Sequence, residues 1–239
     1  MKVSLIDITN NPIEKIYKAY RICYSKDSWE DIKIPQKNNP YYTDGRDGED
    51  REIDDIDEMC DFIVPLMMEQ HTSPLEHVSF SFAIEGISRA CLAQLTRHRT
   101  FKFNVQSQRY VDGSNFDFVM PDLSYIKDKE NKWNADVTMK SYFEEMLLDY
   151  NFLLEMGVKK EDARAILPQA TTCNLIVTMD LNNFRNFLRQ RKCIHAQKEI
   201  RELAFTMIDL IKPHIPFVDH KVLLCEQGLC SKCLDKINQ

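Results

Sequence analysis

Apolar residues alternate with small or polar ones over residues 78–84, which predicts a strand with one buried face. We expect this strand to end at Gly86, because glycine weakens or bends strands. Residues 3–8 and 175–179 have the composition of two further strands, and residues 101–111 suit a loop that runs into an extended segment. The sequence therefore predicts several short strands spread along the chain.

Apolar residues three and four positions apart, the spacing of helices, account for most of the remaining sequence. The expected helices cover residues 12–24, 56–67, 87–97, 139–154, 161–167, 182–191 and 200–211. Asn11 and Asn182 stand where side chains cap the start of a helix, and Gly157 stands where glycine ends one. We expect an α+β fold, in which a mainly antiparallel sheet packs against long helices.

The length of 239 residues is compatible with a single domain, and no internal repeat is visible. Between residues 25 and 51 both periodicities disappear among prolines and glycines, which predicts a surface-loop insertion. Residues 219–239 are expected to form a C-terminal tail. We therefore expect residues 1–239 to form one domain.

The composition is that of an ordinary globular protein, with 44% hydrophobic and 28% charged residues. A net charge of −6 argues against general nucleic-acid binding, because a polyanion is normally met by a basic surface. The sequence has no run of about 18 uncharged apolar residues, which argues against a membrane span or signal peptide and favours the cytoplasm. The eight cysteines have irregular spacing, so we expect reduced thiols.

Basic residues are concentrated between Arg97 and Tyr110, in the sequence RHRTFKFNVQSQRY. Arginine binds phosphate through two parallel hydrogen bonds, so several arginines among short polar side chains favour a pocket for a phosphorylated ligand. A solvated basic surface explains the same composition equally well. The residue types alone leave both interpretations open.

The spacing of this segment resembles the signature of flavin-dependent thymidylate synthases, in which R-H-R is followed after seven residues by serine and then by R-Y. Two more blocks resemble the family in the correct order, one over residues 71–77 and one over residues 182–197. The resemblance covers residues 71–201 well and the termini weakly. It implies the fold of that family and a single catalytic domain over residues 1–239.

The resemblance implies a set of residues that bind the nucleotide dUMP. They are Gln94, Arg97, Gln106, Ser107, Arg109, Arg164 and Arg191. Arg191 is the expected catalytic residue, because a guanidinium beside the pyrimidine stabilises the negative charge that develops as ring carbon 5 becomes nucleophilic. Arg164 would reach the nucleotide of a neighbouring subunit, although without the resemblance it would be an exposed helix arginine. Gln94 and Arg97 are expected to share a helix face.

The resemblance also implies a set of residues that bind FAD. They are His71, Ser73, Glu76, Arg97, His98, Arg99, Asn104, Asn182, Asn186 and His195. Asn182 and Asn186 are expected to share a helix face, as are Arg191 and His195 if their helix continues without a break. Two plainer interpretations stay open: Ser73 and Glu76 as a capping box, and His195 as an ordinary partly buried histidine.

Several positions depart from the pattern of the family. Val105 stands where Glu or Gln more often lies beside the nucleotide, with Gln106 next to it as a substitute. Asp180 and Asn182 stand where other members have Asn and Arg, and Lys102 replaces a common serine. These departures affect individual contacts more than the reaction.

The implied reaction is the reductive methylation of dUMP to dTMP, with 5,10-methylenetetrahydrofolate as carbon donor and NADPH-reduced FAD as hydride source. The resemblance implies neither a cysteine nucleophile nor a metal, and it implies a homotetramer that builds each active site from several subunits. The expected partners are small molecules, without nucleic acid or membrane.

Two other interpretations remain. The arginine-rich segment would also suit a non-catalytic nucleotide- or nucleic-acid-binding module, which the acidic net charge disfavours. Near the C-terminus, Cys225, Cys230 and Cys233 would make a structural zinc site with His214 or His220, but the C-x2-C pair has no second pair.

Overall fold

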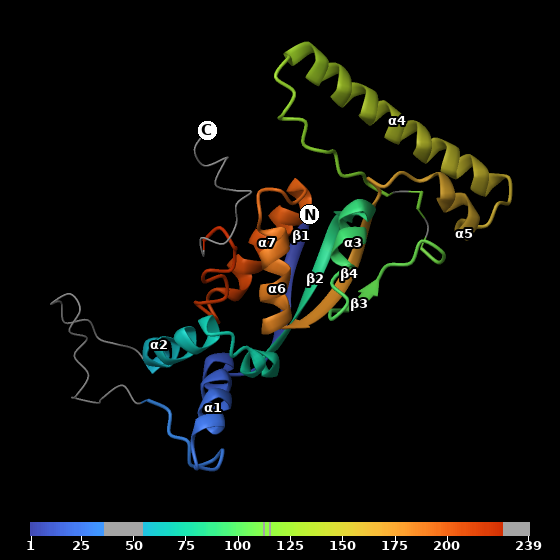
Figure 1. Ribbon diagram of the computed structural model, residues 1–239. Coiled ribbons are helices and arrows are strands. Elements are labelled where there is room, and N and C mark those ends of the chain that lie inside the picture. The colour runs from blue at the N-terminus through green and yellow to red at the C-terminus, as the bar shows by residue number, and fades with distance from the viewer. Residues whose placement is uncertain (36–54, 112, 115, 227–239) are drawn as a thin grey trace. The chain divides into compact units, whose positions relative to one another are not determined.

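A computed structural model describes residues 1–35, 55–111, 113–114 and 116–226 of the chain, and its ribbon is drawn in Figure 1. Four strands form one sheet in the order β1-β2-β4-β3. They are β1 (Lys2–Ile8), β2 (Ser79–Ser88), β3 (Lys102–Val105) and β4 (Thr172–Asp180). Strands β3 and β4 pair antiparallel, with Lys102 opposite Thr178 and Val105 opposite Leu175.

Seven α-helices and two short 3-10 helices complete the described part of the chain. They are α1 (Pro12–Tyr24), α2 (Asp55–Met68), η1 (Ser73–His77), α3 (Arg89–Leu95), α4 (Lys129–Glu155), α5 (Lys160–Ala163), η2 (Arg164–Ile166), α6 (Leu181–Arg191) and α7 (Lys198–Ile211). The predicted α+β fold with a mainly antiparallel sheet is confirmed.

The chain forms two compact units. Unit 1 contains Met1–Ser4, Phe82–Thr178 and Arg191–Thr206, and unit 2 contains Leu5–Ser81, Met179–Gln190 and Met207–Gln239. Of the loop predicted over residues 25–51, residues 25–35 contain neither helix nor strand, and the remainder lies outside the described residues. The predicted tail over residues 219–239 likewise extends beyond the described residues after residue 226.

The alternation read from the sequence describes the strands of unit 1 correctly. In β2, Phe82 and Ile84 are fully buried, and in β4 Leu175 and Val177 are buried while Ile176 between them is exposed. The apolar stripe of α7 is buried in the same way, with Leu203 fully enclosed. Removing these side chains from water supplies most of the stability of the unit.

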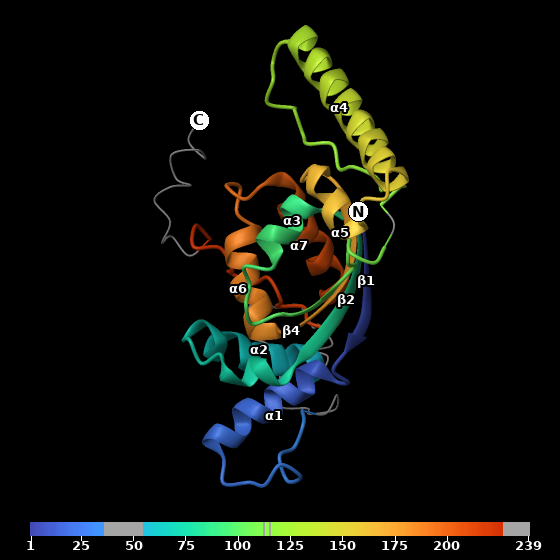
Figure 2. The same cartoon turned by 90° about the vertical axis from the view of Figure 1, so that its right-hand side faces the viewer.

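In unit 2, helices α1 and α2 pack against each other (Figure 2), and the Tyr17 ring meets the edge of Phe62 with ring centroids 5.2 Å apart. The Tyr20 hydroxyl donates a hydrogen bond to the backbone oxygen of His71 at 2.5 Å. Burial raises the pKa of Tyr20 to about 12, so this hydroxyl stays protonated and continues to donate. This bond fixes the segment that enters η1.

Arg185, on α6, is a buried cation of unit 2, only 5% exposed. Its Nη1 donates to the backbone oxygens of Phe217 and Val218 at 3.0 and 2.9 Å, and its Nη2 donates to that of His220 at 2.9 Å. Burial lowers the pKa of Arg185 to about 10, which still leaves it charged at neutral pH. One guanidinium therefore fastens residues 217–220 to α6.

The long helix α4 is capped at both ends by its own residues. The Asp128 carboxylate accepts a hydrogen bond from the backbone N–H of Asn131 at 2.8 Å. At the other end Gly157, with φ of 87°, and Val158 donate to the oxygens of Leu154 and Leu153. This pair of bonds is a Schellman motif, so the prediction that Gly157 ends the helix is confirmed.

The prediction that Gly86 ends its strand is wrong. Gly86 adopts φ of 72°, which glycine tolerates without a Cβ clash, and its N–H donates to the Asn174 side-chain oxygen at 3.0 Å. Strand β2 therefore continues to Ser88. Helix α3 begins only at Arg89, not at residue 87, because the Ser88 hydroxyl caps it by accepting from the Cys91 N–H.

Neither predicted asparagine cap makes the expected side-chain bond. Asn11 occupies the N-cap of α1 in a left-handed conformation, with φ of 46°, and makes no side-chain cap bond. Helix α6 begins one residue earlier than expected, so Asp180 takes the capping place and accepts from the Asn183 N–H at 2.8 Å. An ionised carboxylate at a helix N-terminus also interacts favourably with the helix dipole.

Two segments differ in detail from the prediction. Within residues 101–111 the extended part comes first, as β3, and the turn follows it. The helix expected over residues 161–167 splits into α5 and the 3-10 helix η2. Pro168 explains the early end, because proline disfavours the helical conformation of the residue before it, and Leu167 is extended with ψ of 131°.

Candidate active site

Within unit 1, Arg191 is held by neutral acceptors. Its Nε donates to the His98 Nε2 at 3.1 Å, and its Nη2 donates to the backbone oxygen of Gln94 at 3.1 Å. A longer contact of 3.5 Å joins Nη1 to the Gln94 side-chain oxygen. Burial lowers the pKa of Arg191, with Arg97 adding to the shift. The guanidinium is thus fixed in position while these contacts leave its charge uncompensated.

His98 is buried, and its ring stacks on Phe101 with centroids 5.4 Å apart. Burial, and secondly the charge of Arg191, lower the pKa of His98 to about 4. The imidazole is therefore neutral at pH 7. Because its Nε2 accepts from Arg191, the ring proton resides on Nδ1.

This low pKa predicts a loss of stability in mild acid. The unfolded chain protonates His98 near pH 6.5 and the folded chain only near pH 4, so the unfolded state binds more protons between these values. Stability is expected to fall as pH drops from 6.5 towards 4. Urea unfolding at several pH values measures the free energy of unfolding, which should fall less with decreasing pH in the His98→Gln variant. The same pH dependence in both proteins would contradict the low pKa of His98.

The residues after Arg191 are fastened to α3. The side chain of Gln197 accepts a hydrogen bond from the Gln94 amide. The Glu199 carboxylate, in the first turn of α7, accepts from both the N–H and the hydroxyl of Ser88, at 2.7 and 2.5 Å. The N-terminus of α3 and its last turn are therefore both tied to residues 191–199, which sets the position of Gln94 relative to Arg191.

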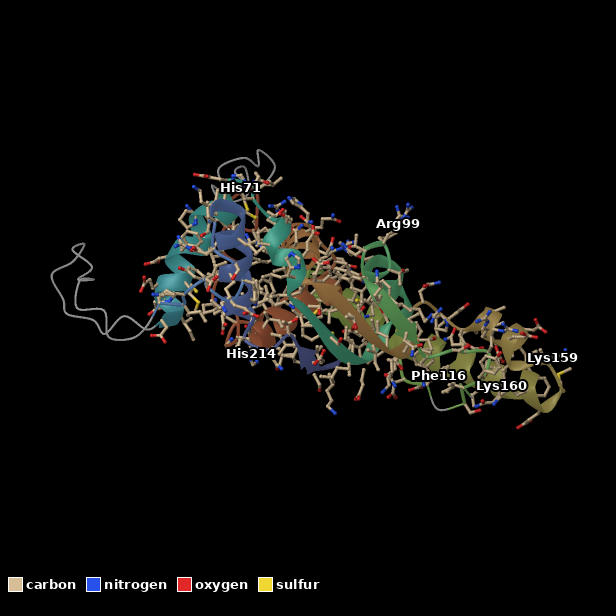
Figure 3. The ribbon with its side chains drawn as sticks, turned by 90° about the horizontal axis from the view of Figure 1, so that it is seen from below. His71, Arg99, Phe116, Lys159, Lys160 and His214 are labelled. Carbon is tan, nitrogen blue, oxygen red and sulfur yellow. The ribbon has the colours of Figure 1, made fainter. Side chains whose placement is uncertain are left out.

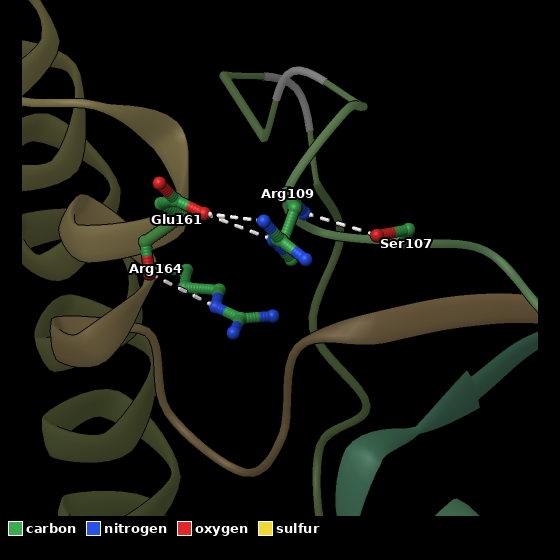
Figure 4. Close-up of polar contacts among 4 residues, drawn as sticks. All are labelled: Ser107, Arg109, Glu161 and Arg164. Atoms are coloured by element: carbon green, nitrogen blue, oxygen red, sulfur yellow. Dashed lines mark hydrogen bonds and ion pairs between the residues drawn. The ribbon is translucent and has the colours of Figure 1, made fainter.

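A second polar group of unit 1 joins the turn after β3 to α5 (Figure 4). The Nε and Nη2 of Arg109 both lie 2.9 Å from one carboxylate oxygen of Glu161. The backbone N–H of Arg109 donates to the Ser107 hydroxyl at 3.3 Å, and the Nε of Arg164 donates to the backbone oxygen of Glu161 at 3.1 Å. Three predicted nucleotide-binding residues, Ser107, Arg109 and Arg164, are thus brought together in one chain. Arg164 was expected to reach the nucleotide of a neighbouring subunit, whereas it lies here beside Glu161, the partner of Arg109 in its own chain.

A cavity of about 320 Å³ opens next to this group. Arg89, Gln108, Arg164 and the stretch from Leu167 to Gln169 are among its lining residues. The backbone N–H of Ala90 donates to the oxygen of Gln169, which holds α3 against that stretch. Gln108 is only 8% exposed, and its Nε2 has no hydrogen-bond partner among the described residues. A buried amide donor left unpaired is costly, so the cavity is chemically suited to a ligand with acceptor oxygens.

A larger, open cavity of about 980 Å³ shares Pro168 and Gln169 with the first. Phe143 of α4 and Gln197 also line it, but none of the predicted nucleotide-binding residues does. The smaller cavity is therefore the better candidate for the nucleotide phosphate.

Gln106, predicted to substitute for the family residue at position 105, is tied to the sheet. Its N–H donates to the oxygen of Asn174 at 2.8 Å, and its side-chain oxygen accepts from the Asn174 N–H at 3.3 Å. The side-chain amide N–H groups of Gln106 therefore remain the part that would contact a ligand.

The predicted flavin-binding residues of unit 1 are mostly exposed. Arg97, Arg99, Asn104 and His195 have exposed side chains, whereas His98 is buried. Figure 3 shows the Arg99 side chain extending away from the ribbon. Neither Arg97 nor Arg99 forms an ion pair with any residue that the structure describes. Both guanidinium groups are thus available to an anionic ligand.

The other predicted flavin-binding residues lie in unit 2, where two of them make contact. The Asn182 side-chain amide donates to the Glu76 carboxylate at 3.0 Å, which joins α6 to η1. Asn186 accepts from Arg189 at 3.3 Å, and His71 and Ser73 are exposed. The cap of η1 is Thr72 and makes no side-chain bond, so the plainer interpretation of Ser73 and Glu76 as a capping box is not supported.

The condition of one helix-face prediction is not met, and another helix-face prediction is wrong. Helix α6 ends at Arg191, so Arg191 and His195 do not share a helix face. The backbone oxygen of Ile194 accepts a hydrogen bond from the Arg201 side chain at 2.9 Å, instead of one from within a longer helix. Helix α3 ends at Leu95, so Gln94 and Arg97 do not share a helix face. The Thr96 hydroxyl donates a hydrogen bond to the backbone oxygen of Leu92 at 3.1 Å.

Sequence reasoning missed Arg89, Gln108, Glu161 and Gln197. Gln108 and Gln197 lie inside the family-like blocks, so their polarity and position offered a signal. Arg89 and Glu161 lie in separate helices and had no motif to mark them; only the fold brings each beside an arginine or amide of the site.

In the described ranges no cluster of three or more His, Cys, Asp or Glu side chains is arranged to hold a metal ion. Cys230 and Cys233, part of the zinc interpretation, lie outside those ranges. No helix in the described part is long and apolar enough to cross a membrane.

The fold is that of the flavin-dependent thymidylate synthases. ThyX from Helicobacter pylori, solved in complex with FAD and dUMP, superposes with a TM-score of 0.67 over 93% of this chain and 100% of that chain, at 22% identity. A family model described as thymidylate synthase complementing protein matches residues 4–217.

The sequence relatives define the family further. The flavin-dependent thymidylate synthase of Nitratidesulfovibrio vulgaris is 36% identical over 243 residues, which cover 96% of this chain and 90% of that protein. That of Pyrococcus abyssi is 34% identical over 217 residues, which cover 88% and 79%. The chain belongs to the flavin-dependent thymidylate synthase family. The predicted family and enzyme class are confirmed, and the non-catalytic alternative is not favoured.

Proposed function

We propose that this chain methylates dUMP reductively to dTMP, with 5,10-methylenetetrahydrofolate as carbon donor and with FAD, reduced by NADPH, as hydride source. Its partners are then these small molecules, without nucleic acid or membrane, and residues 1–239 act as one catalytic domain in the cytoplasm. The support comes from the family relationship and from the chemistry of the side chains gathered in unit 1.

The observation that carries this proposal is the environment of Arg191. Its donors are directed at the neutral imidazole of His98 and at the oxygens of Gln94, so these contacts do not neutralise its charge. A fixed guanidinium in a partly buried setting interacts strongly with negative charge that develops on a nearby pyrimidine. Arg191 is therefore the proposed catalytic residue, and Gln94 and His98 hold it in place.

We assign the nucleotide phosphate to the cavity lined by Arg89, Gln108 and Arg164. Two guanidinium groups and an unpaired buried amide face a space of about 320 Å³, and a phosphate has the acceptor oxygens to satisfy them. Ser107 and Arg109 flank Gln108 in the sequence and supply two more donors. Gln94, Arg97, Gln106 and Arg191 complete the proposed dUMP site.

The side chains proposed for FAD have matching chemistry. Exposed guanidinium groups at Arg97 and Arg99 suit the diphosphate, and the amides and carboxylate of Asn182, Asn186 and Glu76 suit a ring with several hydrogen-bonding edges. His71, Ser73, His98, Asn104 and His195 complete the proposed set. FAD supplies a hydride when bound and reduced, which no protein side chain can do.

A homotetramer with shared active sites is the proposed assembly. Helix α4 has an apolar stripe that faces solvent in the single chain: Trp133, Leu148 and Phe152, with Met156 directly after the helix, are 60 to 69% exposed. An exposed apolar stripe of this kind normally marks a protein–protein interface. Light scattering of the purified protein checks the assembly, and a fully active monomer would refute it.

The test of the function is the release of tritium from carbon 5 of labelled dUMP by protein with bound FAD. We expect release in the presence of methylenetetrahydrofolate, and dTMP formation only when NADPH is added. The flavin absorbance spectrum gives an independent readout. A colourless protein that cannot be reconstituted with FAD and forms no dTMP would favour the non-catalytic alternative.

No single cysteine is expected to be essential. Burial raises the pKa of Cys60 to about 11 and raises those of Cys91 and Cys173 above the ordinary range, so these thiols are poor nucleophiles at neutral pH. All six described cysteines are free thiols. Changing each of the eight cysteines to alanine in turn should leave dTMP formation measurable, and one variant with none would contradict the mechanism.

A further inference from the structure

The guanidinium of Arg109 has an anionic partner within its own chain. Two of its nitrogens, Nε and Nη2, lie 2.9 Å from the same carboxylate oxygen of Glu161 (Figure 4). This edge of a guanidinium is also the one that binds phosphate oxygens. A phosphate bound by Arg109 through these two nitrogens would have to replace the carboxylate of Glu161.

The backbone around Glu161 is fixed, while its side chain is accessible to solvent. The backbone N–H groups of Asp162 and Ala163 donate to the oxygen of Lys159, and the Arg164 guanidinium holds the Glu161 backbone oxygen. The side chains of Arg109 and Glu161 are 53% and 37% exposed. Ion pairs of this exposure are weak and are broken readily, so the contact is able to exchange with a dissolved anion.

We propose that Glu161 is an internal competitor for the nucleotide phosphate and thereby sets the affinity of the site for dUMP. Its carboxylate occupies Arg109 until a phosphate displaces it. This inference rests on the proposed function, in which Arg109 and Arg164 bind the phosphate of dUMP.

The competition lowers the affinity of every anion that uses Arg109 by a similar factor, because each must displace the same carboxylate. A phosphate dianion is best able to offset this cost. It carries three terminal oxygens: some would take the Arg109 nitrogens that Glu161 holds, and the others suit Arg164 and the unpaired Gln108 amide, which line the neighbouring cavity. Glu161 thus sets how tightly the site binds dUMP.

Calorimetric titration of the FAD-loaded protein with dUMP, and separately with inorganic phosphate, tests the proposal. Glu161→Gln keeps the size of the side chain and removes its charge. We expect the Kd of both ligands to fall about two- to tenfold, in line with the strength of exposed ion pairs. The control is Asp162→Asn, which removes the adjacent exposed acid of α5 and should leave both Kd values unchanged.

A rise in the Kd of dUMP in Glu161→Gln would overturn the proposal, because Glu161 would then position Arg109 for binding. An unchanged Kd would overturn it as well. Glu161→Ala, measured in the same way, replaces the first variant should that one fail to fold. In a protein that already carries Arg109→Gln, adding Glu161→Gln should leave the Kd of dUMP unchanged. A parent protein that binds no dUMP refutes the proposed function itself, whereas normal parent binding without tightening refutes only the role of Glu161.

Discussion

Arg191→Lys is expected to slow tritium release from carbon 5 of dUMP about 100- to 1000-fold, the range found when one charge-stabilising donor is removed from an active site. Lysine keeps the positive charge but offers a single mobile ammonium. It cannot contact His98 and both oxygens of Gln94 at once, so the charge is no longer held in one place. The rate is measured at saturating dUMP with the flavin-loaded protein.

The flavin content of Arg191→Lys should equal that of the parent, which separates a chemical defect from a folding defect. Arg21→Lys, an exposed arginine on α1, is the matched control and should keep the parent rate. Near-parent tritium release by Arg191→Lys would show that the guanidinium is not the group that stabilises the ring.

Arg185→Ala is expected to lower the free energy of unfolding by about 3 to 5 kcal/mol. The change removes a buried guanidinium and leaves the backbone oxygens of Phe217, Val218 and His220 without their donor. Each buried acceptor without a partner is unfavourable, and the space left by the side chain adds a cavity. Urea unfolding followed by circular dichroism measures the loss.

Arg185→Lys should lower the unfolding free energy less than Arg185→Ala, because the lysine ammonium can still donate to some of the three backbone oxygens. Lys26→Ala removes an exposed cation of the same unit and should change the unfolding free energy by no more than about 0.5 kcal/mol. A similar small effect for Arg185→Ala would mean that water satisfies the three oxygens after the change.

The sequence pattern was sufficient for the type of most elements, because burial of alternate or helically spaced apolar residues is a local property. Phe82 and Ile84 in β2 and the stripe of α7 illustrate this. The misplaced boundaries have a different cause. Gly86 stays in its strand through a bond to Asn174, which is 88 residues away in the sequence, and no local pattern reports such a bond.

The same limit applies to the site. The family resemblance marked Ser107, Arg109 and Arg164, and the fold gathers them. It did not reveal that Glu161 pairs with Arg109, or that Gln108 is buried with an unpaired amide. A motif reports which residue types recur at fixed offsets, whereas counter-ions and unpaired donors depend on which distant segments meet.

The buried thiols of Cys91 and Cys173 have a consequence for the life of the protein in an oxidising cell. Peroxide and electrophiles attack the thiolate, which is scarce at these two positions. The folded chain therefore protects both sulfur atoms, and the packing of α3 and β4 around them is expected to survive mild peroxide treatment.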